Sequence, residues 1–452
     1  MKSLFIFRRD FRLHDNTAFI ECYKKSDKII PIFIFTPEQV TKSNEYFSSN
    51  AFQFMLESLN DLNTELKNDC NSQIHYFYGD NIDVLKSLLI NFDNIYFNMD
   101  YTPYAKKRDE KIQTFCKENN KECFVYEDYL LMNIGTYLKK DGTPYEKYTP
   151  FKNNAQLIPV NKPNNYTFTG KKLDKIKFTF DLDSLNKYYT KNPNILVHGG
   201  RNNALNILKN MKNFANYEKE RNELNQSTTH LSAYIKFGCV SIREVYNTIF
   251  KLFGIKHTLI SQLYWREFYY YLSYYIPRVL EGKSLKEKYD KIKWENNKTI
   301  LNAWKNGETG FPGVDAGMRE MNETGFMHNR ARLITSGILI KILDCDWRLG
   351  EKYFATQLVD YDPSVNNGNW QWSSGSGADS QPYFRIMSPW KQIIDNDSNC
   401  MYIKKWIPEL RDIPCKDILK WDNSPIKNNY PKPIIDYKFM RGETIKKYKS
   451  AL

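Results

Sequence analysis

The chain changes its hydrophobic pattern near residue 127, and this change limits the folds that it can adopt. Before that point, five short segments rich in β-branched and aromatic residues are bounded by polar turns and separated by helical patterns such as 51–66. The five segments span residues 3–8, 28–35, 73–79, 94–100 and 122–128. Strands that alternate with helices predict a parallel, doubly wound sheet. We therefore expect an α/β domain over residues 1–127.

Beyond residue 199 the strand signals nearly vanish and helical periodicity dominates. Apolar residues recur at helical spacing in 201–222, 241–253, 262–276 and 334–344. The intervening residues 128–198 are rich in Pro, Gly, Asn and Lys, but a loop of this length is rarely structureless within a compact protein. The pattern predicts an ordered connector over 128–198 and an all-α C-terminal domain over 199–452.

The charge of the chain bears on its partners. A net charge of +13 favours a polyanion, because Lys and Arg neutralise phosphates and release their counterions. The many Lys, Asn, Ile and Tyr residues are also typical of AT-rich coding, which enriches Lys for no structural reason. Charge alone therefore favours a nucleic-acid partner only slightly.

Cysteine use and hydropathy indicate the compartment. The eight cysteines form no CxxC pair and there are six histidines, so we expect neither a metal site nor a disulfide framework. Reduced thiols in a soluble, intracellular protein fit this pattern best. No run approaches the ~18 apolar residues of a membrane span. The start, MKSLFIFRRDFRLHD, becomes charged too early for a signal peptide.

The run from 309 to 385 carries the strongest indication of a ligand. It combines a closely spaced pair of tryptophans, several amides and charges of both signs: Trp370, Trp372, Asn329, Asn366, Asn367, Arg330, Arg332, Asp360 and Asp362. Such polar groups are costly in a core unless they are paired. A flat aromatic ligand with polar edges would use all of them.

Two segments further upstream each allow two interpretations. Ser227, Thr228 and Thr229 precede an apolar helix, which is first of all a capping signal, but with Tyr217 and Arg221 nearby they could also receive a phosphate. The segment 262–272 brings Gln262, Trp265, Arg266 and Tyr269 near one helical face. That face is either a buried amphipathic surface or a platform for a base or flavin.

Several other polar and aromatic residues have a structural role as their default interpretation. Arg332 could form an ion pair with Asp360, and His328 is more typical of a structural histidine than of a base. Three tryptophans, Trp294, Trp347 and Trp370, are far apart in the sequence, so spacing says nothing about contact between them.

Ten motifs, taken in order, resemble those of the photolyase/cryptochrome family, and in particular its class I branch, which repairs cyclobutane pyrimidine dimers. They are RRDFRLHDN, NMDYTPYAKKRD, NYEKERN, TTHLSAYIKFG, LYWREFYYYL, TGFPGVDAGMR, GFMHNRAR, DWRLGEKYF, NNGNWQW and QPYFR. The resemblance covers nearly the whole chain. It implies an α/β antenna domain followed by a helical domain that holds FAD.

The resemblance also implies a cofactor site. Residues expected to contact FAD are Tyr217, Thr228, Thr229, His230, Leu231, Ser232, Arg332, Asp360, Tyr361, Asp362 and Asn366. Asn366 would face flavin N5 and suit a reduced, anionic flavin. A second, antenna chromophore is expected in a pocket shaped by loops 36–50 and 98–109, and folate, deazaflavin and flavin all remain open.

The same resemblance implies roles in substrate binding and electron transfer. Trp370, Trp347 and Trp294 match a chain that carries an electron from the surface to the flavin. The residues expected to meet DNA or the flipped lesion are Gln262, Trp265, Arg266, Asn329, Arg330, Trp372 and Arg385. A dimer is already poorly stacked, which lowers the cost of flipping it out of the duplex.

The implied reaction is light-driven repair. Photoexcited reduced FAD passes one electron to the dimer, the ring splits, and the electron returns. Two residues depart from the family pattern: Gln262 stands where Glu is usual, and Leu333 where Met is usual. The branch that repairs (6-4) photoproducts needs a histidine pair, and its positions here are Asn329 and Leu333, which argues against that activity.

Three functions are therefore compared. The first is a repair enzyme, a monomer that acts on DNA containing pyrimidine dimers. The second is a cryptochrome-type photoreceptor with the same FAD and no repair activity, and the third is a flavoprotein without photoactivity or a plain nucleic-acid-binding protein. The basic charge, Trp265, Trp372 and the absence of a cryptochrome-like tail after YKSAL favour the enzyme.

Overall fold

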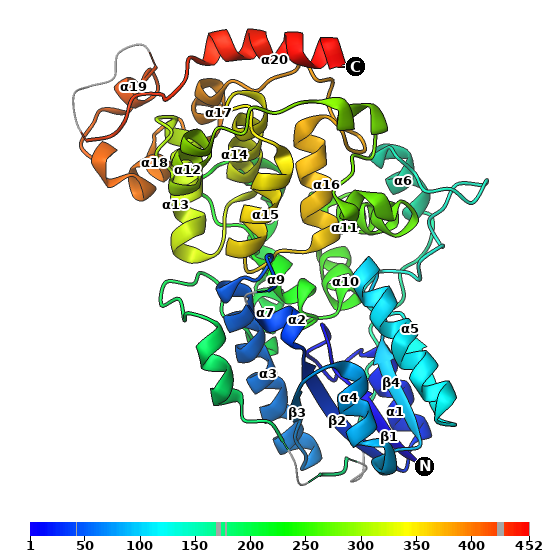
Figure 1. The fold of residues 1–452 in the computed structure, drawn as a ribbon. Coiled ribbons are helices and arrows are strands. Elements are labelled where there is room, and N and C mark those ends of the chain that lie inside the picture. Colours follow the sequence, from blue (N-terminus) through cyan, green and yellow to red (C-terminus); the bar gives the residue numbers. More distant parts are fainter. Residues whose placement is uncertain (42, 169–172, 177–178, 423–428, 452) are drawn as a thin grey trace.

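The computed structural model describes the chain except for residues 42, 169–172, 177–178, 423–428 and 452. Figure 1 shows a sheet flanked by helices in the lower part of the molecule and a larger helical region above it. Residue 42 of loop 36–50, and 169–172 and 177–178 of the predicted connector, lie outside the described residues.

The lower part contains a five-stranded parallel sheet in the order β3-β2-β1-β4-β5. Each strand overlaps one of the five predicted segments: β1 (Lys2–Ile6), β2 (Lys28–Phe35), β3 (His75–Tyr78), β4 (Asn94–Asn98) and β5 (Glu122–Tyr126). The strand order reverses between β1 and β4, as in doubly wound folds. The predicted fold class, an α/β domain followed by helices, is confirmed.

Helices cover both faces of the sheet, so the strands are apolar on both sides. Residues such as Phe5 and Phe33 pack with α1 (Thr17–Lys25) and α3 (Ser49–Cys70). Residues such as Ile30 and Ile95 pack with α4 (Asn81–Ser87) and α5 (Pro103–Glu118) on the other face. The short α2 (Pro37–Val40) follows β2, and η1 (Leu89–Asn91) precedes β4.

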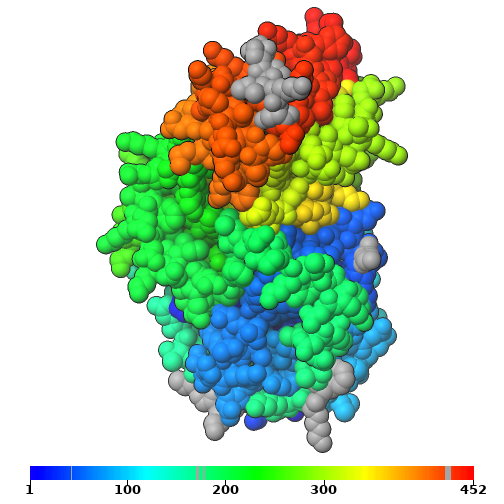
Figure 2. All heavy atoms as spheres, turned by 90° about the vertical axis from the view of Figure 1, so that its left-hand side faces the viewer, coloured from blue at the N-terminus to red at the C-terminus, as the bar shows by residue number. Residues whose placement is uncertain are grey.

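The segment after β5 returns across the sheet domain. Helix α6 (Tyr148–Ala155) packs against α11, and the chain then runs along β2 and β3 to the turn η2 (Leu182–Tyr188). Phe180 N–H donates to the Tyr76 carbonyl at 2.6 Å. Figure 2 shows this stretch, in green, spread over the blue surface of the sheet domain.

The predicted helix 201–222 is wrong as a single element. The chain forms α7 (Arg201–Lys209), the turn η3 (Met211–Phe214) and α8 (Tyr217–Glu220) instead. Asn210 ends α7, and its Nδ2 donates to the Asn206 carbonyl at 2.9 Å. Asn side chains compete with the helical backbone in this way, and the segment is rich in Asn.

The remaining helices build the upper region. They are α9 (Leu231–Lys236), α10 (Ile242–Phe253), α11 (Thr258–Tyr275), α12 (Lys298–Asn306), α13 (Pro312–Thr324), α14 (Asn329–Lys341), α15 (Trp347–Gln357), α16 (Pro363–Ser374), α17 (Pro389–Asn396), α18 (Met401–Trp406), α19 (Cys415–Ile418) and α20 (Tyr437–Ala451). Short turns join them: η4 (Pro277–Glu281), η5 (Glu287–Lys291) and η6 (Pro408–Leu410). Within the described ranges, every helix is too short or too polar to traverse a bilayer.

Two glycines allow α16 to pack closely against its neighbours. A Cβ on Gly350 of α15 would lie 2.2 Å from the Trp370 ring, and one on Gly368 would lie 2.1 Å from the Tyr269 ring. No side chain fits at either position. These contacts fix the position of α16, and with it Trp370, relative to α11 and α15.

The expectation that the cysteines are reduced is wrong for one pair. Cys400, which precedes α18, and Cys415, at the start of α19, form a disulfide with their Cα atoms 5.6 Å apart. The two residues are 15 positions apart in the sequence. The turn between α18 and α19 brings them together, and no cysteine spacing in the sequence indicates this turn.

Candidate functional site

A cavity of about 620 Å³ lies in the helical region between the α8–α9 segment, α11, α14 and α16. Ligand pockets usually measure about 300–1,000 Å³, so a cofactor-sized molecule fits here. Most of the residues that the sequence singles out line this cavity: Tyr217, Thr228, Thr229, His230, Leu231, Ser232, Gln262, Trp265, Arg266, Asn329, Arg332, Asp360, Tyr361, Asp362, Asn366, Trp370 and Trp372. Trp294, Trp347, Arg330 and Arg385 are not part of its lining.

Asp360 anchors one corner of the cavity. Arg332 Nη2 lies 3.0 Å from each carboxylate oxygen, and Ser232 Oγ donates to Oδ2 at 2.7 Å. Arg332 also donates from Nε to the Met327 carbonyl at 2.9 Å. The three side chains come from α9, α14 and the segment before α16, so this corner ties three elements together.

Asp362 connects the cavity to the sheet. It caps α16 by accepting from the Ser364 N–H, and it also accepts from Arg9 Nη1 at 3.1 Å and from the Tyr270 hydroxyl at 2.5 Å. Burial would raise the pKa of Asp362, but Arg9 and Arg266 bring it below its ordinary value. Arg9 follows β1, at the carboxyl edge where such sheets bind ligands.

A second wall carries hydroxyl and guanidinium donors. Thr228 and Thr229 line the cavity together with Tyr217 and Arg221. His230 has a left-handed backbone, with φ of 53°, and burial lowers the pKa of its ring. A wall of this composition suits phosphate oxygens.

Aromatic rings form another part of the lining. Trp265 stacks on Tyr148 of α6 with ring centroids 3.6 Å apart and planes 7° apart. The Trp372 indole donates to the Asp379 carbonyl at 3.1 Å. Gln262 and Asn329 lie in the same lining. The sequence did not point to Tyr148, because the contact joins the connector to a helix more than a hundred residues later.

Asn366 lines the cavity from α16. Its Nδ2 donates to Glu351 on α15, to Oε1 at 3.0 Å and to the main-chain oxygen at 3.3 Å. Glu351 stands behind the cavity wall and is missed by the sequence reasoning, since a lone Glu in an amphipathic helix carries no signal.

Lys236 is a further lining residue that the sequence reasoning missed. Its Nζ donates to the Val359 carbonyl at 3.3 Å. Burial, together with nearby Arg9, lowers the pKa of this amine to about 7. In the sequence, the one indication of this buried amine is a lysine that directly follows the mostly apolar earlier residues of α9.

The three tryptophans matched to the electron-transfer chain belong to one hydrophobic cluster. Trp370 makes ring contacts with Phe354 at 4.9 Å and with Trp304 at 6.2 Å. Trp347 is buried under the Arg348 guanidinium, which lies 4.8 Å from its ring. Trp294 contacts Tyr448 of α20 at 6.2 Å. Trp304, fully buried beside Trp370, was not singled out by the sequence.

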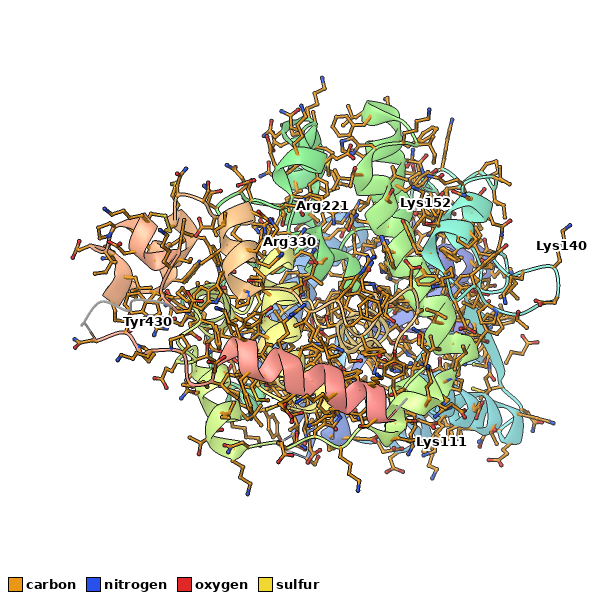
Figure 3. All side chains as sticks on the ribbon, turned by 90° about the horizontal axis from the view of Figure 1, so that it is seen from above. Lys111, Lys140, Lys152, Arg221, Arg330 and Tyr430 are labelled. Carbon is orange, nitrogen blue, oxygen red and sulfur yellow. A yellow bond between two sulfur atoms is a disulfide. The ribbon has the colours of Figure 1, made fainter. Side chains whose placement is uncertain are left out.

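The arginines around the cavity differ in whether they lie at its edge or are bonded inside the protein. Arg330 and Arg221 stand close together in Figure 3, and burial together with the Arg221 charge lowers the pKa of Arg330. Arg385 is exposed and donates to Gln381, a lining residue, at 2.9 Å. Arg266 instead points inward and donates to the Tyr129 carbonyl at 2.7 Å.

Comparisons with known proteins agree with this arrangement. The profile of the family "DNA photolyase" matches residues 3–164, and that of the "FAD binding domain of DNA photolyase" matches residues 259–450. The second range contains α14, α16 and all but the first residue of α11, the helices that line the cavity.

Individual relatives match along the whole chain. A deoxyribodipyrimidine photo-lyase of Buchnera aphidicola (subspecies Baizongia pistaciae) is 34% identical, with 99% of this chain and 98% of that protein covered. The deoxyribodipyrimidine photo-lyase of Escherichia coli is 30% identical, with 98% of both chains covered. The crystal structure of a Sulfolobus tokodaii photolyase with two FAD molecules superposes with a TM-score of 0.90 at 37% identity over 100% of both chains. The chain therefore belongs to the DNA photolyase/cryptochrome family.

Proposed function

We propose that this protein is a deoxyribodipyrimidine photo-lyase of the class I type, which uses light and reduced FAD to repair cyclobutane pyrimidine dimers in DNA. The observation that carries the proposal is a single cavity with two kinds of wall. Charged and hydroxyl side chains around Asp360 and Thr228 face one part of it, and the rings of Trp265 and Trp372 face another. The first suits a dinucleotide cofactor and the second a pyrimidine dimer flipped out of the duplex.

The donor set fits FAD. Tyr217, Arg221 and residues 228–232 would hold its phosphates and ribitol, and Asp360 and Asp362 would accept from its ribose and ring. Asn366 would meet the reactive edge of the ring. Bound in its reduced, anionic form and excited by light, FAD would supply one electron to the dimer and take it back.

The protein's own residues would position the lesion and keep water away from it. Trp265 and Trp372 would stack on the two bases, and Gln262 and Asn329 would donate hydrogen bonds to their carbonyl oxygens. Arg330 and Arg385 would contact phosphates at the rim. Arg266 is engaged inside the protein, so we assign it to stabilising Asp362 rather than to binding DNA.

Trp370, Trp347 and Trp294 would conduct an electron from the surface to the cavity. Their shared hydrophobic cluster supports this assignment. We also retain the division into an antenna domain (1–127), a connector (128–198) and an FAD-binding domain (199–452), in an intracellular monomer.

A flavin is the second chromophore that we favour. Arg8 and Arg108 lie at the carboxyl edge of the sheet, and each has a buried Nη2 without a hydrogen-bond partner among the described residues. Guanidinium donors of this kind suit the phosphate of a flavin nucleotide. The Sulfolobus tokodaii structure, with its two FAD molecules, also supports a flavin as the second chromophore.

The test is repair of an oligonucleotide with one thymine dimer by the purified, photoreduced protein, in light and in darkness. We expect loss of the dimer in light only. The variants W265A and W372A should each weaken dimer binding by roughly fivefold to a hundredfold, because stacking contributes about 1–3 kcal/mol per base. W406A, in α18 outside the cavity lining, is the matched control and should repair normally.

Dimers that stay intact under light, in a protein that holds reducible FAD, would refute repair and favour the photoreceptor. A preparation that binds no flavin would favour plain nucleic-acid binding. Equal loss of activity in W406A would mean that the tryptophan variants report on folding.

A further inference from the structure

Glu351 lies directly behind the cavity wall, where it contacts Asn366. It follows Gly350, whose missing side chain admits the Trp370 ring, and it is 5% exposed. Both hydrogen bonds that Asn366 makes through Nδ2 go to Glu351, at 3.0 and 3.3 Å. An amide held by its nitrogen must turn its oxygen the other way. Asn366 therefore presents Oδ1 to the cavity.

Two tyrosines hold the same carboxylate. Tyr361, a cavity residue, and Tyr46, in the loop between α2 and α3, both donate hydrogen bonds to Glu351. Their rings lie nearly parallel, with centroids 6.1 Å apart. Glu45 pairs with Lys352 at 2.5 Å, which ties this loop to α15. Tyr46 comes from the sheet domain and is 41% exposed, so the network runs from the solvent to Asn366.

We propose that Glu351 is a positioning residue that sets which atom of Asn366 faces the cofactor, and that Tyr46 holds Glu351 in the state that presents the oxygen. The proposal rests on the proposed function, because it takes FAD as the occupant of the cavity. It adds a contribution of the α/β domain to the flavin site that does not involve the second chromophore.

The direction of the effect follows from hydrogen-bonding capacity. An ionised carboxylate only accepts, so it satisfies Asn366, Tyr361 and Tyr46 together. A protonated Glu351 could donate to Oδ1 of Asn366, and the amide would then turn Nδ2 toward the cavity. The group that faces the flavin would change from an acceptor to a donor as the pH falls.

This change falls in an accessible pH range. Burial raises the pKa of Glu351 to about 7, and hydrogen bonds from Asn366, Tyr361 and Tyr46 oppose that rise. The charged or titratable groups around it are Tyr46 and Glu45 from the loop, Lys352 from α15, and Tyr361 and Asp362 from the segment before α16. Removing the Tyr46 hydroxyl takes away one bond that favours the ionised form, so the pKa of Glu351 should rise further.

The experiment follows the ratio of oxidised to reduced FAD, bound to the full-length protein and poised against a fixed redox couple, across pH. The wild type should show an inflection near pH 7 in addition to the slope of the cofactor itself. E351Q should lack this inflection, and Y46F should move it to higher pH. Y353F is the matched control, because Tyr353 lies on the same helix and its hydroxyl bonds to Asn322 instead.

Each outcome decides between the two proposals. Identical profiles in the wild type and E351Q, both with bound FAD, would overturn the role of Glu351 and leave the proposed function intact. A wild type that binds no FAD would instead refute the proposed function. If E351Q does not fold, Y46F still carries the test, because its position is half-exposed. An unmoved inflection in Y46F would then exclude the contribution of the sheet domain.

Discussion

Polar and charged side chains build both the contact between the two domains and the wall of the cavity. They are paired with opposite charges at the contact, whereas in the cavity wall they are only partly hydrogen-bonded. At the contact, Arg12 is 1% exposed and donates to Asp128 at 2.5 Å and to the Asp15 carbonyl at 2.8 Å. Arg243 donates to Asp128 at 2.8 Å and to Asp15 at 2.9 Å. Burial would raise the pKa of Asp128, yet the two guanidiniums lower it below its ordinary value. Each charge meets an opposite charge.

In the cavity the polar groups keep part of their capacity free. Gln262 makes one long bond, from Nε2 to the Thr258 carbonyl at 3.5 Å, and Asn366 uses only its nitrogen. Just outside the lining, burial and the neighbouring Arg221 charge lower the pKa of Arg330. Buried polar groups are normally satisfied, so spare capacity that faces a cavity indicates a ligand. The comparison separates residues that hold the fold from residues that hold a substrate.

The largest change in stability should come from removing a charge from the paired contact between the domains. The variant D128N leaves Arg12 and Arg243 buried without a full counter-charge, and removal of one partner from a buried ion pair costs about 3–5 kcal/mol. We expect a clearly lower melting temperature, measured by thermal unfolding. The control is E287Q, which removes an exposed partner of Arg278 and should change stability by less than about 1 kcal/mol.

The stability difference between D128N and the wild type should also depend on pH. Because the folded-state pKa of Asp128 is depressed, its contribution is present above the unfolded value of about 3.9 and is lost as the pH falls through the lower folded value. The gap should therefore narrow in acid. A gap that stays constant down to low pH would mean that geometry, rather than charge, is lost in D128N.

The sequence predicts what depends on local pattern. The strand β2 is recognisable as an apolar run, KIIPIFIF, because both faces of a parallel sheet are buried. Asp362 precedes Pro363, a combination typical of a helix start, and it does cap α16. The resemblance to a family supplied the list of cavity residues, which no spacing could give.

Contacts between distant segments could not be predicted. Tyr148 reaches Trp265 across more than a hundred residues, and Tyr46 reaches Glu351 across about three hundred. The break of 201–222 into three pieces depends on an asparagine that bonds to its own helix. In the first two cases the partner lies outside any window over which hydrophobic periodicity can be read. In the third case the partner is only four residues away, but a bond from an amide side chain to the backbone leaves no trace in the hydrophobic pattern.

A smaller effect should come from Arg330 and Arg385, the two arginines that we assign to DNA phosphates. R330Q and R385Q should each weaken binding to dimer-containing and undamaged DNA to a similar degree and reduce the salt slope of binding by about one. K111Q is the control, since Lys111 is exposed on α5 of the sheet domain, away from Arg330 in Figure 3. Binding measured at several salt concentrations checks this. A loss confined to dimer-containing DNA would show that the arginines read the lesion instead of the backbone.

The smallest effect should come from the residue that departs from the family pattern. Gln262 cannot release a proton, so it contributes hydrogen bonds that do not change with pH. In Q262E, burial in the cavity should raise the pKa of the new carboxyl above about 4.3, and its protonated form could donate to a base carbonyl, while the ionised form could not. The ratio of the Q262E to the wild-type repair rate should therefore increase as the pH falls, by severalfold, since one hydrogen bond contributes about 1 kcal/mol.

Taking this ratio of rates cancels the pH dependence of groups common to both proteins, such as Lys236 and Glu351. L333M alters the same wall without adding a titratable group and should give a ratio that is flat with pH. A flat ratio for Q262E as well would show that position 262 does not contact the lesion.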